Sequence, residues 1–523
     1  MPRTAFSPLQ RAAVCGDAPA LRRLAPAGTW LTAWAHVLDS DFEAGRAAAE
    51  PLTDLAGRAA HLLAATMDNT AAPGALDALA GEGLSMTPGH LDPSERGEPW
   101  AQWGLCLLGE AAMSAGRLDL AESVALHTLA IGDRADAATV FTAQTLARAL
   151  LFQGRLAEAG DALDLARAHP LYSDVGGLKL VVAGTSAYLA ALADDRVTLD
   201  RSADEIDAET AVSASSYLTR GALVLSAYAL AAGGRGERAA TVLLAGAGGP
   251  RLSALQHLDR VYGYELLIAA SLSVGDLRRA RTWLRVAERT SGADPTGMAG
   301  AALQRSMARV AVAEGRHGDS AVVAARAAEL AGGRAGHLDA TRAHLLAAQA
   351  LLQGGDSATA QLRLQEAGVQ ATLMGAVSLT LLARRDLRSI GLRFAGADQE
   401  PMSQREREVA ELVISGLSNA EIARELNLSE RTVHGHVRAV LRALGVPSRA
   451  GLARSLGAST RPDAPDLTDR QRQVAVLVRR GYTNDGIARE LGVSVKTVEK
   501  HIGDAYRRLG VRSRAALAAT VVD

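Results

Sequence analysis

Residues 402–453 read MSQREREVAELVISGLSNAEIARELNLSERTVHGHVRAVLRALGVPSRAGLA, and residues 467–518 read LTDRQRQVAVLVRRGYTNDGIARELGVSVKTVEKHIGDAYRRLGVRSRAALA. Aligned without a gap at an offset of 65 residues, the two stretches are identical at 26 of 52 positions. Half identity across the whole stretch indicates that a small domain has been duplicated. This repeat decides the fold of the C-terminal part of the chain.

Each copy predicts four short helices. The first helix has a capping signal in which the side chains satisfy free backbone N–H groups: Ser403 with Glu406 in one copy, and Thr468 with Gln471 in the other. The N-caps expected for the later helices are Ser418, Ser429, Ser448, Thr483, Ser494 and Ser513. The glycines expected to end helices are Gly416, Gly445, Gly481 and Gly510.

Apolar residues recur at helical spacing within each copy and predict a small core. The first two helices of each copy are expected to bury Val409, Leu412, Val413, Ile422, Ala423 and Leu426, and Val474, Leu477, Val478, Ile487, Ala488 and Leu491. The third helix is expected to bury Val433, Val437, Val440 and Leu444, and Val498, Ile502, Ala505 and Leu509.

Two short helices joined by a tight turn, with a longer helix after the turn, follow the helix-turn-helix plan. Both copies resemble the LuxR/NarL-type DNA-binding domain through G-[LY]-[ST]-N-x-x-I-A-R-E-L-x-[LV]-S-x-x-T-V-x-x-H and the closing L-G-V-x-S-R. The resemblance covers about 50 residues of each copy. It implies a bacterial, sequence-specific transcriptional regulator whose partner is double-stranded DNA at an operator or promoter.

The resemblance also implies which residues face DNA. The base-reading positions carried over from the family are His434, Gly435 and Arg438, then Glu499, Lys500 and Gly503. The phosphate-facing positions carried over are Arg431, Thr432 and His436, then Lys496, Thr497 and His501. The family often has Lys at the first reading position, where this chain has His434 and Glu499, so the two copies are expected to prefer different DNA sequences. The alternative for each residue is a solvated surface group.

The charge distribution agrees with a polyanion partner for this end of the chain. Residues 401–523 carry a net charge of +6, whereas the preceding 400 residues carry −7. Each copy is weakly basic, with +2 for residues 401–460 and +4 for residues 461–523. The connector, residues 457–466 (GASTRPDAPD), has two prolines and no apolar periodicity, so it is expected to be an extended linker.

A second repeat, of about 40 residues, runs through residues 111–393. Its turn marks are Gly116, Gly154, Asp195, Gly234, Gly275, Gly315 and Gly355. Alanine follows five residues later at Ala121, Ala159, Ala239, Ala280 and Ala360, and twelve residues later at Ala166, Ala287, Ala327 and Ala367. Small residues allow a neighbouring helix to approach closely, so the pattern predicts a solenoid of helical hairpins. It is similar to tetratricopeptide repeats, whose usual period is 34; an irregular helical domain is the alternative.

The sequence therefore predicts an all-α chain, because Ala and Leu dominate its apolar content and only 3% of its residues are aromatic. The predicted domains are an N-terminal helical region (1–110), a tetratricopeptide-like arm (111–393), and two LuxR-type helix-turn-helix domains (400–456 and 466–523). The tryptophans Trp30, Trp34, Trp100, Trp103 and Trp283 are expected to pack in a core, with a pocket lining as the alternative.

Large LuxR-type regulators place such an arm after an ATPase. This sequence has no GxxxxGK[ST], so the ATPase is expected to be absent. The arm is then expected to bind an effector, either a small molecule or a protein. The resemblance also implies two further candidate partners: RNA polymerase, and a second copy of the chain in a homodimer.

Other function classes find no support in the residues. With only Cys15 and Cys106, and with scattered histidines, the sequence predicts no disulfide framework, no metal site, no cofactor and no catalytic set, and hence no enzyme. The longest uncharged run, residues 367–383, is too short and too polar to span a bilayer, which predicts no membrane partner. The low cysteine count predicts a cytoplasmic protein, and the resemblance implies that it acts at the bacterial nucleoid. The rival function is an adaptor whose solenoid binds protein and whose duplicated domains mainly mediate association.

Overall fold

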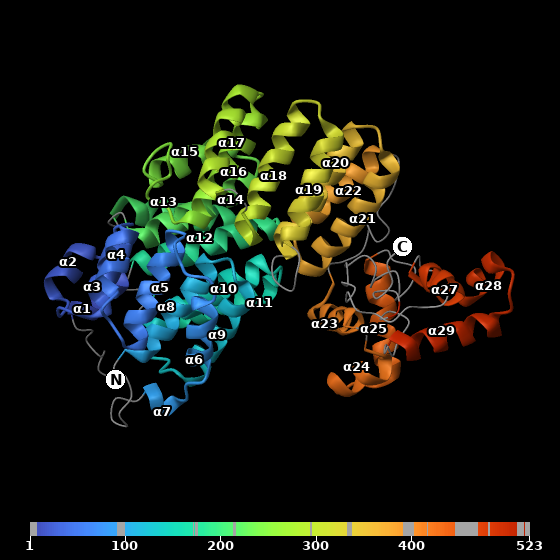
Figure 1. Cartoon of the computed structure of the whole chain (residues 1–523), viewed down its shortest axis with the longest axis horizontal. Helices are drawn as coiled ribbons and strands as arrows, with labels where there is room; N and C mark the ends of the chain where they lie inside the picture. The colour runs from blue at the N-terminus through green and yellow to red at the C-terminus, as the bar shows by residue number, and fades with distance from the viewer. Residues whose placement is uncertain are drawn as a thin grey trace. The chain divides into compact units, whose positions relative to one another are not determined.

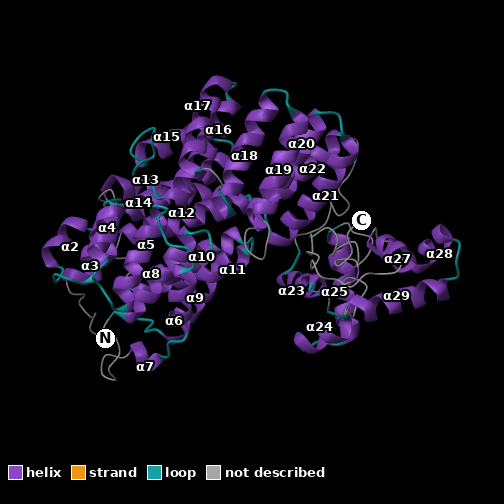
Figure 2. Ribbon diagram, viewed as in Figure 1, coloured by secondary structure: helices purple, strands orange, loops and turns teal. Residues whose placement is uncertain are grey.

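The structure is a computed structural model of the 523-residue chain. It describes residues 8–91, 100–170, 172, 176–212, 216–292, 295–331, 337–390, 402–415, 417–444, 469–479, 482–509 and 517. Within these ranges the regular structure is helical throughout, without a strand (Figure 2), which confirms the predicted all-α class. None of the helices so described combines the length and the apolar character needed to cross a membrane.

The chain divides into two compact units, residues 1–356 and 357–523, so the division falls inside the predicted arm. The first unit begins with seven helices: α1 (Pro8–Cys15), α2 (Ala18–Leu24), α3 (Trp30–Leu38), α4 (Phe42–Ala49), α5 (Leu55–Met67), α6 (Ala75–Leu84) and α7 (Pro88–Leu91). The N-terminal caps of α2, α4 and α5 are aspartates whose carboxylates accept backbone N–H groups: Asp17, Asp41 and Asp54.

Helical hairpins fill the rest of the first unit (Figure 1). Their helices are α8 (Ala101–Ser114), α9 (Leu118–Ile131), α10 (Ala138–Phe152), α11 (Leu156–Ala168), α12 (Gly176–Ala193), α13 (Arg196–Val212), α14 (Tyr217–Ala232), α15 (Gly236–Gly246), α16 (His257–Ser273), α17 (Leu277–Ser291), α18 (Gly297–Ala313), α19 (His317–Ala331) and α20 (His337–Gln353). From α8 onward, the two helices of each pair pack together and the first helices of successive pairs also touch. This is the order of contacts expected for hairpin repeats.

Six of the seven predicted turn marks lie where the chain reverses inside these hairpins, and the seventh, Gly355, lies between α20 and α21, where the two units divide. The six marked glycines have φ between 72° and 85°, the left-handed region in which glycine has no steric penalty. At the non-glycine mark the left-handed residue is Asp194, one position before the predicted Asp195. Asp195 instead caps α13, its Oδ1 accepting the N–H of Thr198 at 3.1 Å. Aspartate can fill both places because its short polar side chain tolerates left-handed backbone and caps helices.

The alanines of the repeat are buried as their spacing predicts. All nine have at most 1% of their surface exposed. A larger side chain at these places would collide with the neighbouring helix, because packed interiors leave no spare volume. Local spacing therefore predicted the packing face of the repeat.

Tryptophans pack near the junction of the N-terminal helices with the first hairpin. Trp30 is 1% exposed, stacks on Trp103 with ring centroids 5.3 Å apart, and meets the edge of Trp100 at 5.8 Å. Trp34 is also buried, whereas Trp100 and Trp283 are half-buried. Core packing is thus confirmed for Trp30, whereas Trp34 and Trp103 are buried and also line a cavity, which was the alternative. Helix α8 runs across residue 110, where the sequence predicts the boundary between the N-terminal region and the arm. The bounds of the four domains therefore remain a prediction.

The second unit begins with the hairpin of α21 (Ser357–Met374) and α22 (Val377–Ser389), whose reversal is made by Gly375 with φ of 76°. Its remaining helices form two small bundles. The first head consists of α23 (Gln404–Ile414), α24 (Asn419–Glu425) and α25 (Glu430–Ala443). The second head consists of α27 (Asp469–Arg479), α28 (Asn484–Leu491) and α29 (Val495–Leu509). The connector at 457–466 lies outside the described residues.

Candidate nucleic-acid interface

Serine caps begin all three helices of the first head. Ser403 and Glu406 form a complete capping box on α23, and Ser418 forms another on α24 with its partner three residues on, Glu421. Ser429 begins α25, its hydroxyl accepting the N–H of Thr432 at 3.1 Å. The caps predicted for the first head are confirmed up to this helix.

The second head repeats these caps where the structure describes it. Thr483 caps α28 by accepting the N–H of Gly486, and Ser494 accepts the N–H of Thr497 at 3.1 Å. Leu517 is helical and fully buried, which places a residue of the predicted fourth helix in the core. The remaining predicted caps and helix ends lie outside the described residues: Gly416, Gly445, Ser448, Thr468, Gly481, Gly510 and Ser513.

The turn between the second and third helices has the same construction in both heads. Its first residue is left-handed, Asn427 with φ of 52° and Gly492 with φ of 62°. An arginine from the first helix then donates to the last carbonyl of the second helix: Arg405 to Leu426 at 2.7 Å, and Arg470 to its counterpart, Leu491, at 2.8 Å. These arginines fix the angle between the two helices by satisfying a free carbonyl. These two contacts were not predicted from the sequence, although an arginine recurs at the same place in both copies.

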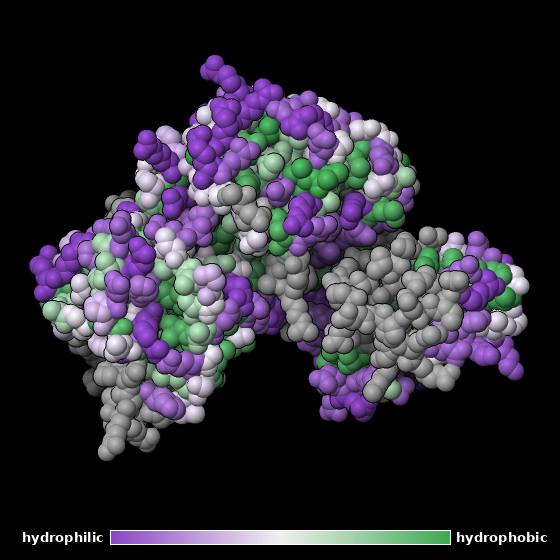
Figure 3. Space-filling model, in the orientation of Figure 1, coloured by the Kyte–Doolittle hydropathy of each residue, from purple (hydrophilic) through white to green (hydrophobic). Residues whose placement is uncertain are grey.

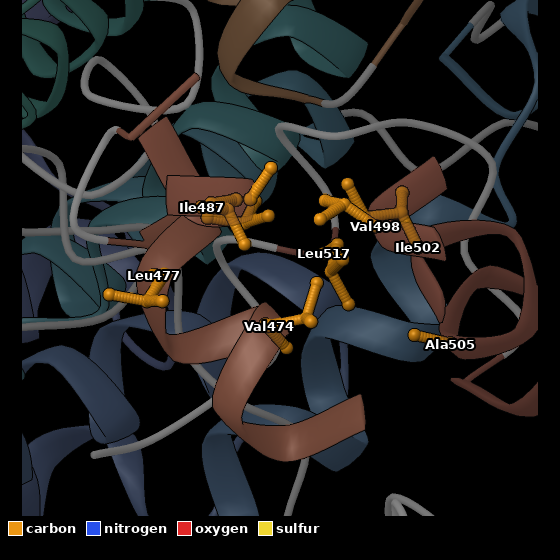
Figure 4. Close-up of a cluster of buried hydrophobic side chains, with 10 residues drawn as sticks. Val474, Leu477, Ile487, Val498, Ile502, Ala505 and Leu517 are labelled. Carbon is orange, nitrogen blue, oxygen red and sulfur yellow. The ribbon is translucent and has the colours of Figure 1, made fainter. Parts of the chain in front are cut away.

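Most of the predicted core residues are buried in each head, but Leu412, Leu426 and Leu491 are only half-buried, and the side chain of Leu509 lies outside the described residues. Figure 4 shows the core of the second head, where Val474, Ile487 and Val498 are fully buried and belong to one cluster with Leu517. In the first head the equivalent fully buried residues are Val409, Val413, Ile422, Val433 and Val440. The third helix is therefore held by its apolar side, and its opposite side faces outward.

Every residue that the resemblance carries over lies on this outward side or at its margin. The exposed residues are Arg431, Thr432, His434, Gly435, Arg438, Lys496, Glu499 and Lys500. The half-buried residues are His436, Thr497, His501 and Gly503. The structure thus brings all twelve onto two helix faces that resemble each other. On the side of the molecule that Figure 3 shows, the described surface of the heads is mostly hydrophilic, with small hydrophobic areas.

The threonines at the start of these helices are partly occupied by the caps. The Thr432 hydroxyl lies 2.7 Å from the Ser429 hydroxyl, and the Thr497 hydroxyl lies 2.8 Å from that of Ser494. Each serine–threonine pair holds the first turn of the third helix, where a helix N-terminus favours anions. Across the described parts of the chain, no group of three His, Cys, Asp or Glu side chains is arranged to hold a metal ion.

Glycines on the outward faces weaken the third helices. Gly435 and Gly503 lie inside α25 and α29, and a Cβ added at either would meet no atom within 4 Å. Gly435→Ala and Gly503→Ala are therefore expected to raise the free energy of unfolding of their head by about 1 kcal/mol, because alanine restricts the unfolded chain. Urea unfolding measured by circular dichroism checks this. Gly492→Ala is the control of opposite sign, expected to lower the free energy of unfolding by about 1–2 kcal/mol because the φ of Gly492 is positive. Destabilisation by all three changes would contradict the placing of Gly435 and Gly503 at open positions inside helices.

Comparisons with known proteins place both heads in one family. The model of the luxR family of bacterial regulatory proteins matches residues 400–456 and 465–521. The chain is 42% identical over 67 residues to the transcriptional regulatory protein UhpA of Escherichia coli, an alignment that covers 13% of this chain and 34% of UhpA.

A longer similarity extends beyond the heads. The chain is 31% identical over 246 residues to the HTH-type transcriptional regulator MalT of Serratia proteamaculans, which covers 46% of this chain and 24% of that protein. An alignment of this length takes in residues before the heads as well. The chain spans only about a quarter of that relative and a third of the Escherichia coli protein. The two C-terminal heads belong to the luxR family of bacterial regulatory proteins.

Proposed function

We propose that the chain is a sequence-specific DNA-binding regulator of transcription, with two heads that read DNA and a helical arm that senses an effector or partner. The observation that carries the proposal is the pair of outward helix faces that bear exposed cations, among them Arg431 and Arg438 on α25, and Lys496 and Lys500 on α29. A helix held by one apolar side, with cations on the other, can enter a major groove. The function implied by the curated relatives' names, transcriptional regulation, supports the same conclusion.

The cations on each face have different roles in this proposal. Arg431 and Lys496 lie in the first turn, beside the capping serines, where they contact phosphates. Arg438 and Lys500 lie further along the helices and donate to guanine edges. The heads act at DNA in the bacterial cytoplasm, and no enzymatic step is part of this function. RNA polymerase and a second copy of the chain are partners that the proposal allows without requiring them.

Arg438→Ala and Lys500→Ala are each expected to weaken binding at the preferred site by about 1–3 kcal/mol and to relax the preference at one base position. Arg431→Ala is the matched control, expected to weaken all sequences alike and to flatten the dependence of affinity on salt. Selection of binding sites from random DNA, followed by fluorescence anisotropy at several salt concentrations, measures both effects. Equal behaviour of all three variants would refute the division between reading and positioning residues.

If the chain is an adaptor, we expect a different result from the same DNA-binding measurements. If the heads mainly mediate protein association, the full chain binds DNA weakly and without sequence preference, and the arginine and lysine variants leave its self-association unchanged. Salt-sensitive, sequence-selective binding by the full chain supports the regulator over the adaptor.

A further inference from the structure

A cavity lies inside the first unit, far from the heads in sequence. The volume that it leaves open to a water-sized molecule is about 80 Å³, and it is bordered by α3, α8, α10, α12, α14, α16 and α18. Its aromatic wall consists of Trp34, Trp103, Phe141, Phe152, Tyr217, Tyr228 and Tyr262. The rest of its wall is mostly aliphatic or sulfur-containing, with Leu107, Met113 and Leu258 among its residues. An apolar lining with a few polar groups is typical of a small-molecule site.

One carboxylate of the cavity, that of Glu110, already has its acceptor positions occupied by protein donors. Glu110 accepts hydrogen bonds from the Thr145 hydroxyl at 3.0 Å, from Arg148 at 3.0 and 3.1 Å, and from the Tyr217 hydroxyl at 2.9 Å. The Arg148 guanidinium is thereby paired within the wall. A ligand anion would have to compete with Glu110 for that cation.

The second carboxylate, Asp259, is much less satisfied. It lies in the first turn of α16 and accepts one hydrogen bond, from the amide nitrogen of Gln256 at 3.0 Å. Burial raises its pKa, against the opposing effects of the Gln256 hydrogen bond and the Arg148 charge. Because Glu110 and Arg148 offset each other, the ionised form of Asp259 gives the cavity a net negative charge.

The other open polar groups are acceptors too. The Oε1 atoms of Gln144 and Gln256 are buried and have no hydrogen-bond partner. Their amide nitrogens are used, that of Gln256 by Asp259 and that of Gln144 by the Val181 carbonyl at 3.0 Å and by the Thr185 hydroxyl. These nitrogen contacts fix the orientation of both amides, so each presents its oxygen. Leaving a buried acceptor without a donor costs free energy, so a ligand that brings a hydrogen-bond donor gains binding free energy here.

We propose that this cavity binds a small molecule with a largely apolar, aromatic body and a positively charged amine, with the ammonium group facing Asp259. The aromatic wall favours such a cation further, because ring faces attract it. A polyol would leave most of its hydroxyls against aliphatic side chains, and an anion would face Asp259. The regulatory meaning of the site rests on the proposed function, in which the arm senses an effector; the binding itself does not depend on it.

The test uses three probes that share one body and differ in the charge of the end group: phenylbutylamine, phenylbutanol and phenylbutyrate. Isothermal titration calorimetry of the full chain, without DNA, is expected to show the amine binding at least about tenfold more tightly than the alcohol, and the carboxylate binding most weakly. No heat from the amine at millimolar concentration would overturn the proposal, as would equal binding of amine and carboxylate. Because DNA is absent, failure here leaves the DNA-binding function untouched.

Two variants separate the cavity from the rest of the surface. Gly221 lines the cavity on α14, and an added Cβ would meet no atom within 4 Å, so Gly221→Leu fills the site without removing a contact. It is expected to abolish binding of the amine. Gly81→Leu is the matched control, at an exposed glycine of α6 that also has open space, and it is expected to bind the amine as the unaltered chain does. Unchanged amine binding in Gly221→Leu would show that the probe binds elsewhere.

The third variant tests the role of charge. Asp259→Asn is expected to remove the preference for the amine over the alcohol while keeping the affinity for the alcohol within about twofold. Retention of the full preference in this variant would show that another group holds the ammonium, and would overturn the assignment to Asp259.

Discussion

Removal of one buried carboxylate, by Glu265→Ala, is expected to lower the free energy of unfolding of the first unit by about 3–5 kcal/mol. Glu265 lies on α16, is 1% exposed, and forms two hydrogen bonds with Arg305 of α18, at 2.9 and 2.7 Å. Arg309 donates to it at 2.7 Å and Arg342 of α20 at 3.3 Å. Without the carboxylate, the fully buried Arg305 would keep only Asp339 as an anionic partner.

The measurement is urea unfolding of the full chain followed by circular dichroism. Glu329→Ala is the control, because Glu329 pairs with Arg326 at 2.9 Å on the surface, with both side chains more than 60% exposed. That variant is expected to lose less than about 0.5 kcal/mol. Glu265→Gln keeps the shape of the side chain and gives a second measurement if the alanine variant does not fold. Losses no larger than that of the control would show that the buried cluster contributes nothing.

The same cluster predicts how stability depends on pH. Burial opposes ionisation of Glu265, but the charges of Arg305, Arg342 and Arg309 outweigh burial and hold the pKa of the carboxyl well below its usual range. The unfolded chain therefore binds this proton at a higher pH than the folded chain does. The contribution of Glu265 is complete at neutral pH and is lost as the pH falls below the ordinary glutamate value of about 4.3. Glu265→Gln is expected to flatten the loss of stability in acid.

Reversing the charges of only one head is expected to weaken binding of the full chain to its preferred DNA by about 100-fold to 10,000-fold. The variants are Arg431→Glu with Arg438→Glu in the first head, and Lys496→Glu with Lys500→Glu in the second. Two weakly basic heads on one chain bind together because the second head is held near DNA at a roughly millimolar effective concentration, and that gain disappears when either head fails.

Fluorescence anisotropy at constant salt measures this effect. The control reverses two exposed arginines one helical repeat apart on α17, Arg278→Glu with Arg285→Glu, which changes the net charge of the chain by the same amount. The control is expected to change affinity by less than about threefold, because α17 belongs to neither head and carries none of the residues that the proposal places at DNA. An effect confined to the first head would mean that the second head, with its Glu499 and Gly503, serves as a packing partner and does not contact DNA.

The heads could be predicted from the sequence because their structure depends on neighbours in the chain. Ser418 and Glu421 are three residues apart, the buried Val433 and Val440 recur at helical spacing, and a left-handed residue such as Gly492 needs no partner at all. Because the domain is duplicated, the same pattern occurs twice in the chain. The twelve residues carried over from the family lie on outward helix faces for the same local reason, although their contacts with DNA remain a prediction.

In the arm, the sequence determined the repeat and its small buried residues, because turn glycines and alanines such as Ala159 act within one hairpin. The sequence could not determine the cavity or the buried ion cluster. Glu110 meets Tyr217 across 107 residues, and Glu265 meets Arg342 across 77, so each pair forms only when separate hairpins pack. A polar residue on a helix looks like a surface residue until its partner is known. Tertiary structure alone decided which charges are buried, because burial of a charge is tolerated only where packing brings its counter-charge within reach.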